Sequence, residues 1–152
     1  MRYRIVAVGK LRSSFYREAC ERYLKRIAPL ATCEVVEVRE AHGADASATK
    51  LAEGAALLAK AEGFAVALDE RGKAFDTQGL AQRVGALENR GVSQVTILVG
   101  GAEGHGPELR AAVEESWSLS PLTLPHDLAR LVLIEQLYRI ETLRAGHPYH
   151  RG

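Results

Sequence analysis

A chain of 152 residues is long enough for one well-buried domain and short for two. Of its residues 47% are hydrophobic and 26% charged, as in an ordinary soluble protein, and no apolar run approaches the roughly 20 residues that span a bilayer. Cys20 and Cys33 show neither C-x-x-C spacing nor a disulfide-rich pattern, which fits a reducing compartment. We therefore expect a single cytoplasmic domain over residues 1–152, with no membrane span and no disulfide framework.

The net charge of +1 conceals an uneven distribution. Residues 1–26 carry eight Lys or Arg against two Glu, a balance of +6, whereas residues 34–120 carry eight basic against fourteen acidic residues, a balance of −6. Such segregation can form a local positive face for an anionic partner. A solvated helix surface explains the same pattern, so charge alone identifies no partner.

Strand and helix patterns alternate along the chain. Segments with strand character are residues 3–8, 33–38, 64–68, 95–99 and, more weakly, 116–120. Helices are predicted from Ser13 or Ser14 to Pro29, over residues 48–62, from Asp76 or Thr77 to Gly91, and from Pro125 to about Ala145. A polar loop ending at Ser47 is expected to be mobile, and residues 69–73 to form a turn. The alternation predicts an α/β domain with a mostly parallel sheet flanked by helices.

Ligands in such folds collect at the carboxyl ends of the strands. The exits at Leu68 and Gly100, and the loop after residues 116–120, could therefore converge on one pocket. That loop is unusually apolar for a surface connection, since its residues include Leu119, Pro121, Leu122, Leu124 and Pro125. Because loop backbones normally need water, we expect it to be buried against something, and a cofactor with an apolar ring face would suit.

Gly100, Gly101 and Gly104 follow the strand at residues 95–99 without a spacer. The Walker A pattern fails here, because Pro107 and Glu108 stand where Lys and Ser or Thr are required. The dinucleotide fingerprint G-x-G-x-x-G fails as well. These absences argue against a P-loop NTPase and against NAD binding. The glycines then serve either contact with another ligand or tight packing.

The last predicted helix carries apolar residues on more than one face, which is too many for a helix with one side in water. They are Leu128, Leu131, Val132, Leu133, Ile134, Leu137, Tyr138 and Ile140. A symmetric dimer is the simplest source of a second surface, and packing wholly within one chain is the alternative.

Five motifs together resemble the large-subunit ribosomal RNA methyltransferase H family of the SPOUT class. They are Val-Gly-Gly-Ala-Glu-Gly at 99–104, Ser-Trp-Ser-Leu-Ser at 116–120, Leu-Thr-Leu-Pro-His at 122–126, Leu-Ile-Glu-Gln-Leu-Tyr-Arg at 133–139 and His-Pro-Tyr-His-Arg at 147–151. The segment Ile-Val-Ala-Val-Gly-Lys at 5–10 and the chain length match too, so the likeness covers the whole chain.

The resemblance implies an S-adenosylmethionine-dependent homodimeric enzyme that methylates N3 of a pseudouridine in 23S-type ribosomal RNA on assembled ribosomes. It also implies a C-terminal trefoil knot, against the general rule that chains do not thread loops. Carried over by position, the cofactor contacts are Leu68, Gly100, Leu119, Ser120, Pro121, Leu122, Thr123 and Leu124. Rival interpretations are a SPOUT enzyme with another RNA substrate and a ribosome-binding factor without catalysis.

The C-terminal tail supplies the catalytic hypotheses. His147 and His150, with His126, could form a metal site, but no Cys or acidic cluster accompanies them and we expect no metal. A disordered tail is an alternative. We expect Tyr149, His150 and Arg151 to bind the RNA and order over the cofactor, with Arg151 or His150 stabilising negative charge on the base.

Three further side chains have two interpretations each. His126 either removes the proton from the base or is a helix-start residue bonded to backbone. Glu103 either bonds the cofactor or, as we prefer, caps the following helix. Glu135 is either a partner for an Arg or a cofactor contact.

Overall fold

The computed structural model describes residues 1–151, with the side chains of residues 1–149. Strands and helices alternate from the N-terminus to the last long helix. They are β1 (Arg2–Val8), α1 (Ser14–Ile27), β2 (Thr32–Val38), α2 (Ala46–Ala59), β3 (Phe64–Ala74), α3 (Thr77–Asn89), β4 (Gln94–Val99), α4 (Pro107–Ala112), β5 (Glu115–Ser118), α5 (His126–Arg144) and the 3₁₀ turn η1 (Pro148–Arg151).

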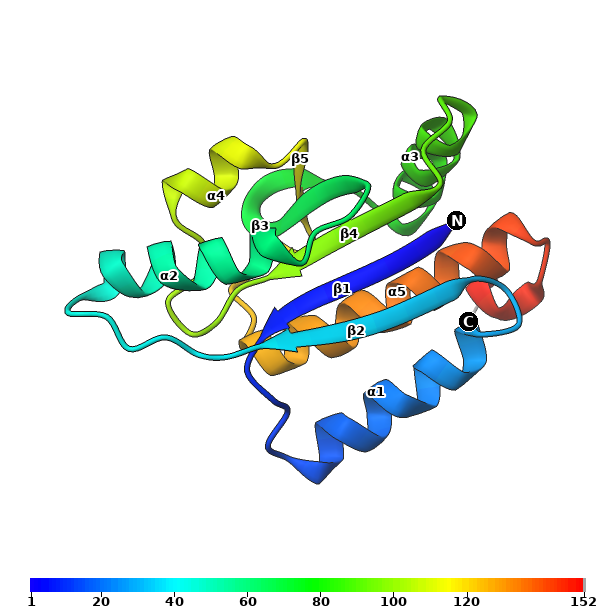
Figure 1. The fold of residues 1–152 in the computed structure, drawn as a ribbon. Coiled ribbons are helices and arrows are strands. Elements are labelled where there is room, and N and C mark those ends of the chain that lie inside the picture. Colours follow the sequence, from blue (N-terminus) through cyan, green and yellow to red (C-terminus); the bar gives the residue numbers. More distant parts are fainter. Residues whose placement is uncertain (152) are drawn as a thin grey trace.

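The five strands form one sheet in the order β2-β1-β4-β3-β5, and every neighbouring pair is parallel (Figure 1). In β1 and β4, continuous apolar runs are buried, as expected for central strands covered on both faces. The predicted α/β fold with a parallel sheet flanked by helices is therefore confirmed. The trefoil knot stays a prediction.

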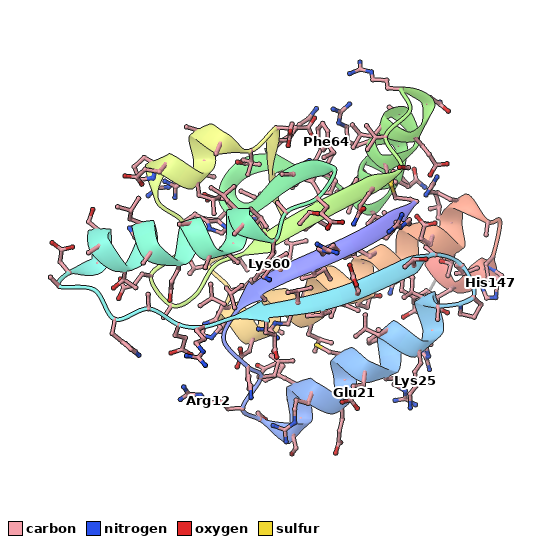
Figure 2. The ribbon with its side chains drawn as sticks, in the orientation of Figure 1. Arg12, Glu21, Lys25, Lys60, Phe64 and His147 are labelled. Atoms are coloured by element: carbon pink, nitrogen blue, oxygen red, sulfur yellow. The ribbon has the colours of Figure 1, made fainter. Side chains whose placement is uncertain are left out.

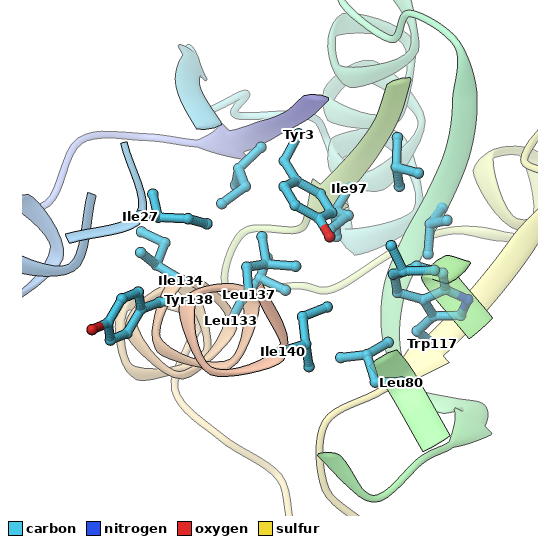
Figure 3. Close-up of a cluster of buried hydrophobic side chains, with 14 of the residues drawn as sticks. Tyr3, Ile27, Leu80, Ile97, Trp117, Leu133, Ile134, Leu137, Tyr138 and Ile140 are labelled. Carbon is cyan, nitrogen blue, oxygen red and sulfur yellow. The ribbon is translucent and has the colours of Figure 1, made fainter. Parts of the chain in front are cut away.

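Helices cover both faces of this sheet (Figure 1). The larger core cluster joins one face to side chains of α1, α3 and α5, and Figure 3 shows Leu133, Leu137 and Ile140 of α5 within it. The smaller cluster joins the other face to Leu57 of α2 and Leu109 of α4. The helices cover the two faces of the sheet but not the carboxyl ends of its strands, where a site can form.

Most apolar residues of α5 pack in the core of their own chain. Leu137 is fully buried in the larger cluster, whereas Leu128 and Val132 are half-buried and belong to neither cluster. Packing within the chain thus accounts for the most apolar face of the helix. Leu128 and Val132 are the positions that remain for contact with a second copy.

The turn predicted for residues 69–73 is wrong, because β3 continues to Ala74. Its pairing with β5 is interrupted after Leu68 and resumes at Lys73, which is the signature of a bulge. Gly72 permits this irregularity, since a Cβ atom there would lie 2.5 Å from the carbonyl carbon of Ser116. Asp69 Oδ1 also accepts a hydrogen bond from the Arg71 backbone N at 2.9 Å within the bulge.

Two helix starts show how local capping sets element boundaries. Asp76 caps α3 as predicted, with Oδ1 accepting from the backbone N of Gly79 at 2.7 Å. Asp45 caps α2 in the same way, accepting from the backbone N of Ala48 at 2.8 Å. Residues 46–47 are therefore helical, and the loop predicted to reach Ser47 ends earlier.

Candidate active site

A cavity of about 650 Å³ lies at the carboxyl ends of β4 and β5, beside the irregular part of β3 that follows Leu68. We call it the main cavity. Its walls include seven of the eight residues to which the resemblance assigns cofactor contacts, and Pro121 is the one that does not line it; the seven are Leu68, Gly100, Leu119, Ser120, Leu122, Thr123 and Leu124. The three predicted segments thus converge on one cavity, although they lie far apart in the sequence and Leu68 lies within β3 rather than at its end.

The loop after β5 is held in shape by its own hydroxyl groups. Ser118 Oγ donates to the carbonyl of Ser120 at 3.0 Å, and Ser120 Oγ accepts from the backbone N of Leu122 at 2.9 Å. Thr123 Oγ1 donates to Glu70 Oε2 at 2.8 Å and so ties the loop to β3. Leu122 is 71% exposed at the cavity wall. An exposed leucine on a fixed loop provides an apolar surface for a flat ring.

Backbone and a buried imidazole form another part of the main cavity. A Cβ atom on Gly100 would lie 3.2 Å from the carbonyl carbon of Gly104 and 3.3 Å from the His105 ring, so only glycine fits without displacement. Nε2 of His105 lies 3.0 Å from the carbonyl oxygen of Leu98. Burial lowers the pKa of His105, so the ring is neutral and donates Nε2–H to that carbonyl.

A charged pair closes the wall near β3. Arg110 Nε donates to Asp69 Oδ2 at 2.6 Å, and both side chains line the main cavity. Burial acts to raise the pKa of Asp69, but the hydrogen bonds from Arg110 and the Arg71 backbone outweigh it and hold the pKa below its usual value. Asp69 is therefore a carboxylate at neutral pH, with a guanidinium beside it.

The three side chains with two interpretations each have distinct positions. His126 is the first residue of α5, lines the main cavity and has Nε2 3.3 Å from Asp127 Oδ1. Glu103 also lines the cavity, and the preferred capping role is wrong, because α4 begins after Gly106 without a side-chain cap. Glu135 pairs with Arg139, with Oε1 2.7 Å from Nη2, and does not line the main cavity.

The C-terminal tail lies near the amino ends of the strands, whereas the main cavity lies near their carboxyl ends. Arg130 near the start of α5 donates to the carbonyl of Gly9, just after β1, whereas Glu141 near the end of the helix accepts from the Tyr3 hydroxyl at the other end of β1. In Figure 2, Arg12, which follows β1, lies well apart from His147, which follows α5. The structure does not bring the predicted catalytic tail to the main cavity of the same chain.

Tyr149 of the tail packs on the last part of α5. Its ring centroid is 4.6 Å from that of Tyr138 and 4.8 Å from the Arg139 guanidinium carbon, and its hydroxyl donates to Glu135 Oε1 at 3.3 Å. Burial, with the Tyr23 hydroxyl and nearby Glu135, raises the pKa of Tyr149 to about 12, so the phenol is protonated. The side chains of His150 and Arg151 lie outside the described part of the chain.

Other site types find little support among the described residues. Over that part of the chain, no group of three or more His, Cys, Asp or Glu side chains is placed to hold a metal ion. None of its helices is both long and apolar enough to pass through a bilayer.

Residues 1–150 match the family model described as Predicted SPOUT methyltransferase, and the chain belongs to that family. It is therefore an enzyme that transfers methyl groups. Among curated proteins it is similar to ribosomal RNA large subunit methyltransferase H of Gloeobacter violaceus, at 47% identity with both chains covered completely. The protein of the same name from Thermus thermophilus is 47% identical over 99% of each chain, and that from Anaeromyxobacter dehalogenans is 46% identical over 99% of this chain and 100% of its own.

Proposed function

We propose that this enzyme transfers the methyl group of S-adenosylmethionine to N3 of a pseudouridine in 23S ribosomal RNA on the assembled ribosome. The observation that carries the proposal is the main cavity, where β3 and the loops after β4 and β5 bring together seven residues at the cofactor positions of a family whose members match this chain over almost their full length. The names of these relatives supply the ribosomal RNA substrate.

The main cavity suits this cofactor in size and chemistry. Its volume of about 650 Å³ lies within the range of sites for molecules of this size. Leu119, Leu122 and Leu124 would hold the adenine, while Gly100 allows the backbone to approach closely. Asp69 and Arg110 provide a carboxylate and a cation for the polar parts of the molecule.

The bound cofactor supplies a methyl group that its sulfonium has already activated. What remains for the chain is to hold the base in line and to favour its deprotonated form. His126 lines the main cavity and is the described side chain that we assign to proton removal. Tyr149, His150 and Arg151 would bind the RNA, with Arg151 or His150 stabilising negative charge on the ring.

This assignment requires two chains. The helix α5 has 19 residues and is therefore roughly 28 Å long, and the main cavity and the tail lie at its two ends. The tail of one chain is thus too far from its own cavity to cover it. We propose a homodimer in which the tail of each chain completes the cavity of the other, with half-buried Leu128 and Val132 of α5 at the interface.

The first test is calorimetric titration with S-adenosylmethionine of the wild type and of Leu122→Asp. The exposed position of Leu122 makes the variant tolerable to folding, while a carboxylate on the apolar wall should abolish binding. Binding by the wild type alone would support the cofactor site. A folded wild type that binds no cofactor, yet binds ribosomes, would instead support a ribosome-binding factor without catalysis.

The substrate needs a separate measurement. Assembled ribosomes lacking the methyl group are incubated with enzyme and labelled cofactor, and the modified nucleoside is identified after digestion. Label in N3-methylpseudouridine of 23S RNA is the expected outcome. Label in another RNA would favour a SPOUT enzyme with a different substrate.

A further inference from the structure

A second cavity, of about 530 Å³, lies between the carboxyl ends of β1 and β4. Its lining includes Val8 at the end of β1 and Gly101 just after β4. These strands are neighbours in the sheet, but β1 connects onward to β2 at one edge and β4 to β5 at the other. The crevice at such a switch point is a recurrent ligand site in open α/β sheets.

The two cavities adjoin each other. Gly101, Ala102, Glu103 and His126 line both of them. A ligand in the second cavity would therefore lie beside a cofactor in the main one, which is the arrangement that a methyl transfer between two bound molecules requires.

Glu53 of α2 lines the second cavity with a carboxylate that is only half satisfied. The residue is 5% exposed, and Oε2 accepts a hydrogen bond from the backbone N of Ala41 at 3.0 Å. Among the described residues, Oε1 is buried without any hydrogen-bond partner. Leaving a buried charged oxygen unpaired is costly, so a donor from a bound ligand is its expected partner.

Gly101 lies against this buried oxygen. A Cβ atom at this position would lie 3.0 Å from Glu53 Oε1 and 3.1 Å from Val8 Cγ1. Any larger residue would therefore press on the carboxylate at the border between the two cavities.

The charges of the second cavity favour a neutral ligand with N–H groups. Glu53 contributes a carboxylate with a buried, unpaired oxygen and Asp127 a second carboxylate, and both would repel a phosphate. The basic residues of the lining are at its solvent side: Lys10 is exposed, and the Arg12 side chain, paired with Glu40 at 3.5 Å, is 83% exposed. A polynucleotide with its phosphates at the rim and one base inside matches this distribution.

We propose that the second cavity binds the target base and that Glu53 Oε1 accepts a hydrogen bond from N1–H of pseudouridine. The inference rests on the proposed function. Pseudouridine is joined to its ribose through carbon, so N1 carries a hydrogen, whereas N1 of uridine carries the ribose and has none. Methylation at N3 leaves N1–H in place, so the hydrogen bond persists through the reaction. Uridine would leave the buried acceptor unpaired and would be disfavoured.

Glu53→Gln tests this role with little structural change. The amide oxygen can keep the bond to Ala41, while the NH₂ group replaces Oε1 and opposes the N1–H donor. Single-turnover methylation is measured on assembled ribosomes that carry either pseudouridine or uridine at the target position. We expect the variant to lose roughly 10- to 100-fold in rate on pseudouridine and little on uridine, so that discrimination shrinks by the same factor.

Two further readouts separate substrate recognition from a structural role. Affinity for S-adenosylmethionine should be unchanged by calorimetry. The thermal midpoint should be unchanged or higher, because the variant removes an unpaired buried charge. Glu21→Gln, the same chemical change at an exposed position of α1, is the matched control and should leave every readout as in the wild type.

Other outcomes would overturn the inference. An equal loss on both RNAs, unchanged discrimination, or a loss of cofactor affinity that accounts for the lower rate would each remove Glu53 from recognition of N1–H. In all of these the wild type still methylates the RNA and the proposed function stands. A wild type that methylates neither RNA would refute the proposed function, and the inference with it.

Discussion

The two ends of α5 differ in what they offer to a ligand. At its start, β3 and the loops after β1, β4 and β5 surround two adjoining cavities with glycines, apolar side chains and incompletely paired carboxylates. At its end, the charged groups are paired with each other: Arg144 contacts both Glu88 and Glu141, and Arg139 contacts Glu135. The first end of α5 therefore offers cavities for ligands, whereas the second end carries ion pairs and the C-terminal tail. A functional site that uses both must join two chains.

The largest effect is expected from the tail. Arg151→Ala should reduce methylation of assembled ribosomes by at least about 100-fold, because negative charge on the base would lose its stabilising cation. Cofactor affinity by calorimetry should remain that of the wild type, since the cavity is at the other end of α5. Full turnover by this variant would show that Arg151 has no part in the reaction.

Mixed dimers sharpen the comparison between the two ends. Leu122→Asp impairs the cavity and Arg151→Ala the tail, so neither homodimer should be active. In a statistical mixture, half of the dimers carry one subunit of each kind. If the tail acts on the other chain, each mixed dimer keeps one intact site and the mixture recovers about a quarter of wild-type activity. Recovery of no activity, with subunit exchange demonstrated, would place both parts in one chain.

The interface itself can be tested at two positions of α5. Val132→Asp adds a charge at a half-buried site outside both core clusters, and it should give folded monomers with little activity. Leu137→Ala, in the core of the chain, should instead destabilise the fold by about 2–5 kcal/mol in denaturant titrations. Sedimentation and circular dichroism distinguish these results. A Val132→Asp variant that stays dimeric would place the interface elsewhere.

Local sequence patterns predicted the five strands of the sheet and the segments that meet at the main cavity, while the individual cofactor contacts came from the resemblance. Buried apolar runs located β1 and β4 to within a residue, and the unusual apolarity of the loop at 119–124 marked it as a ligand surface. The extension of β3 depends on pairing with β5, which is distant in the sequence. The local pattern of residues 69–73 therefore predicted a turn. The separation of tail and cavity follows from the direction of α5 along β1, and no local pattern encodes that.

The burial of Glu53 is a further feature that the local sequence does not predict. Within the Ala- and Leu-rich segment 48–62 this residue resembles an ordinary surface glutamate. Its burial results from the packing of α2 over the ends of β1 and β4, and from Gly54, whose Cβ position lies 3.5 Å from Leu109 of α4. A lone acid beside a glycine in an apolar helix was the available signal.

The smallest effect concerns His105, which supports the backbone beneath Gly100. Because burial lowers its pKa in the folded chain, the unfolded chain binds a proton more readily, and stability is lost as the pH falls below about 6.5, the usual pKa of histidine. The slope approaches about 1.4 kcal/mol per pH unit while the folded ring stays neutral. His105→Gln can keep a donor near the Leu98 carbonyl without titrating, so its stability in denaturant between pH 7 and pH 5 should depend less on pH than that of the wild type. Identical pH dependence in the two proteins would mean that the ring is protonated as readily in the folded state as in the unfolded state.

The two ends of α5 should also differ in their response to acid. Loops at the cavity end should open more often at mildly acidic pH, while the ion pairs at the tail end persist. Hydrogen exchange at the backbone amides of Gly100 and Arg144 would show this difference directly.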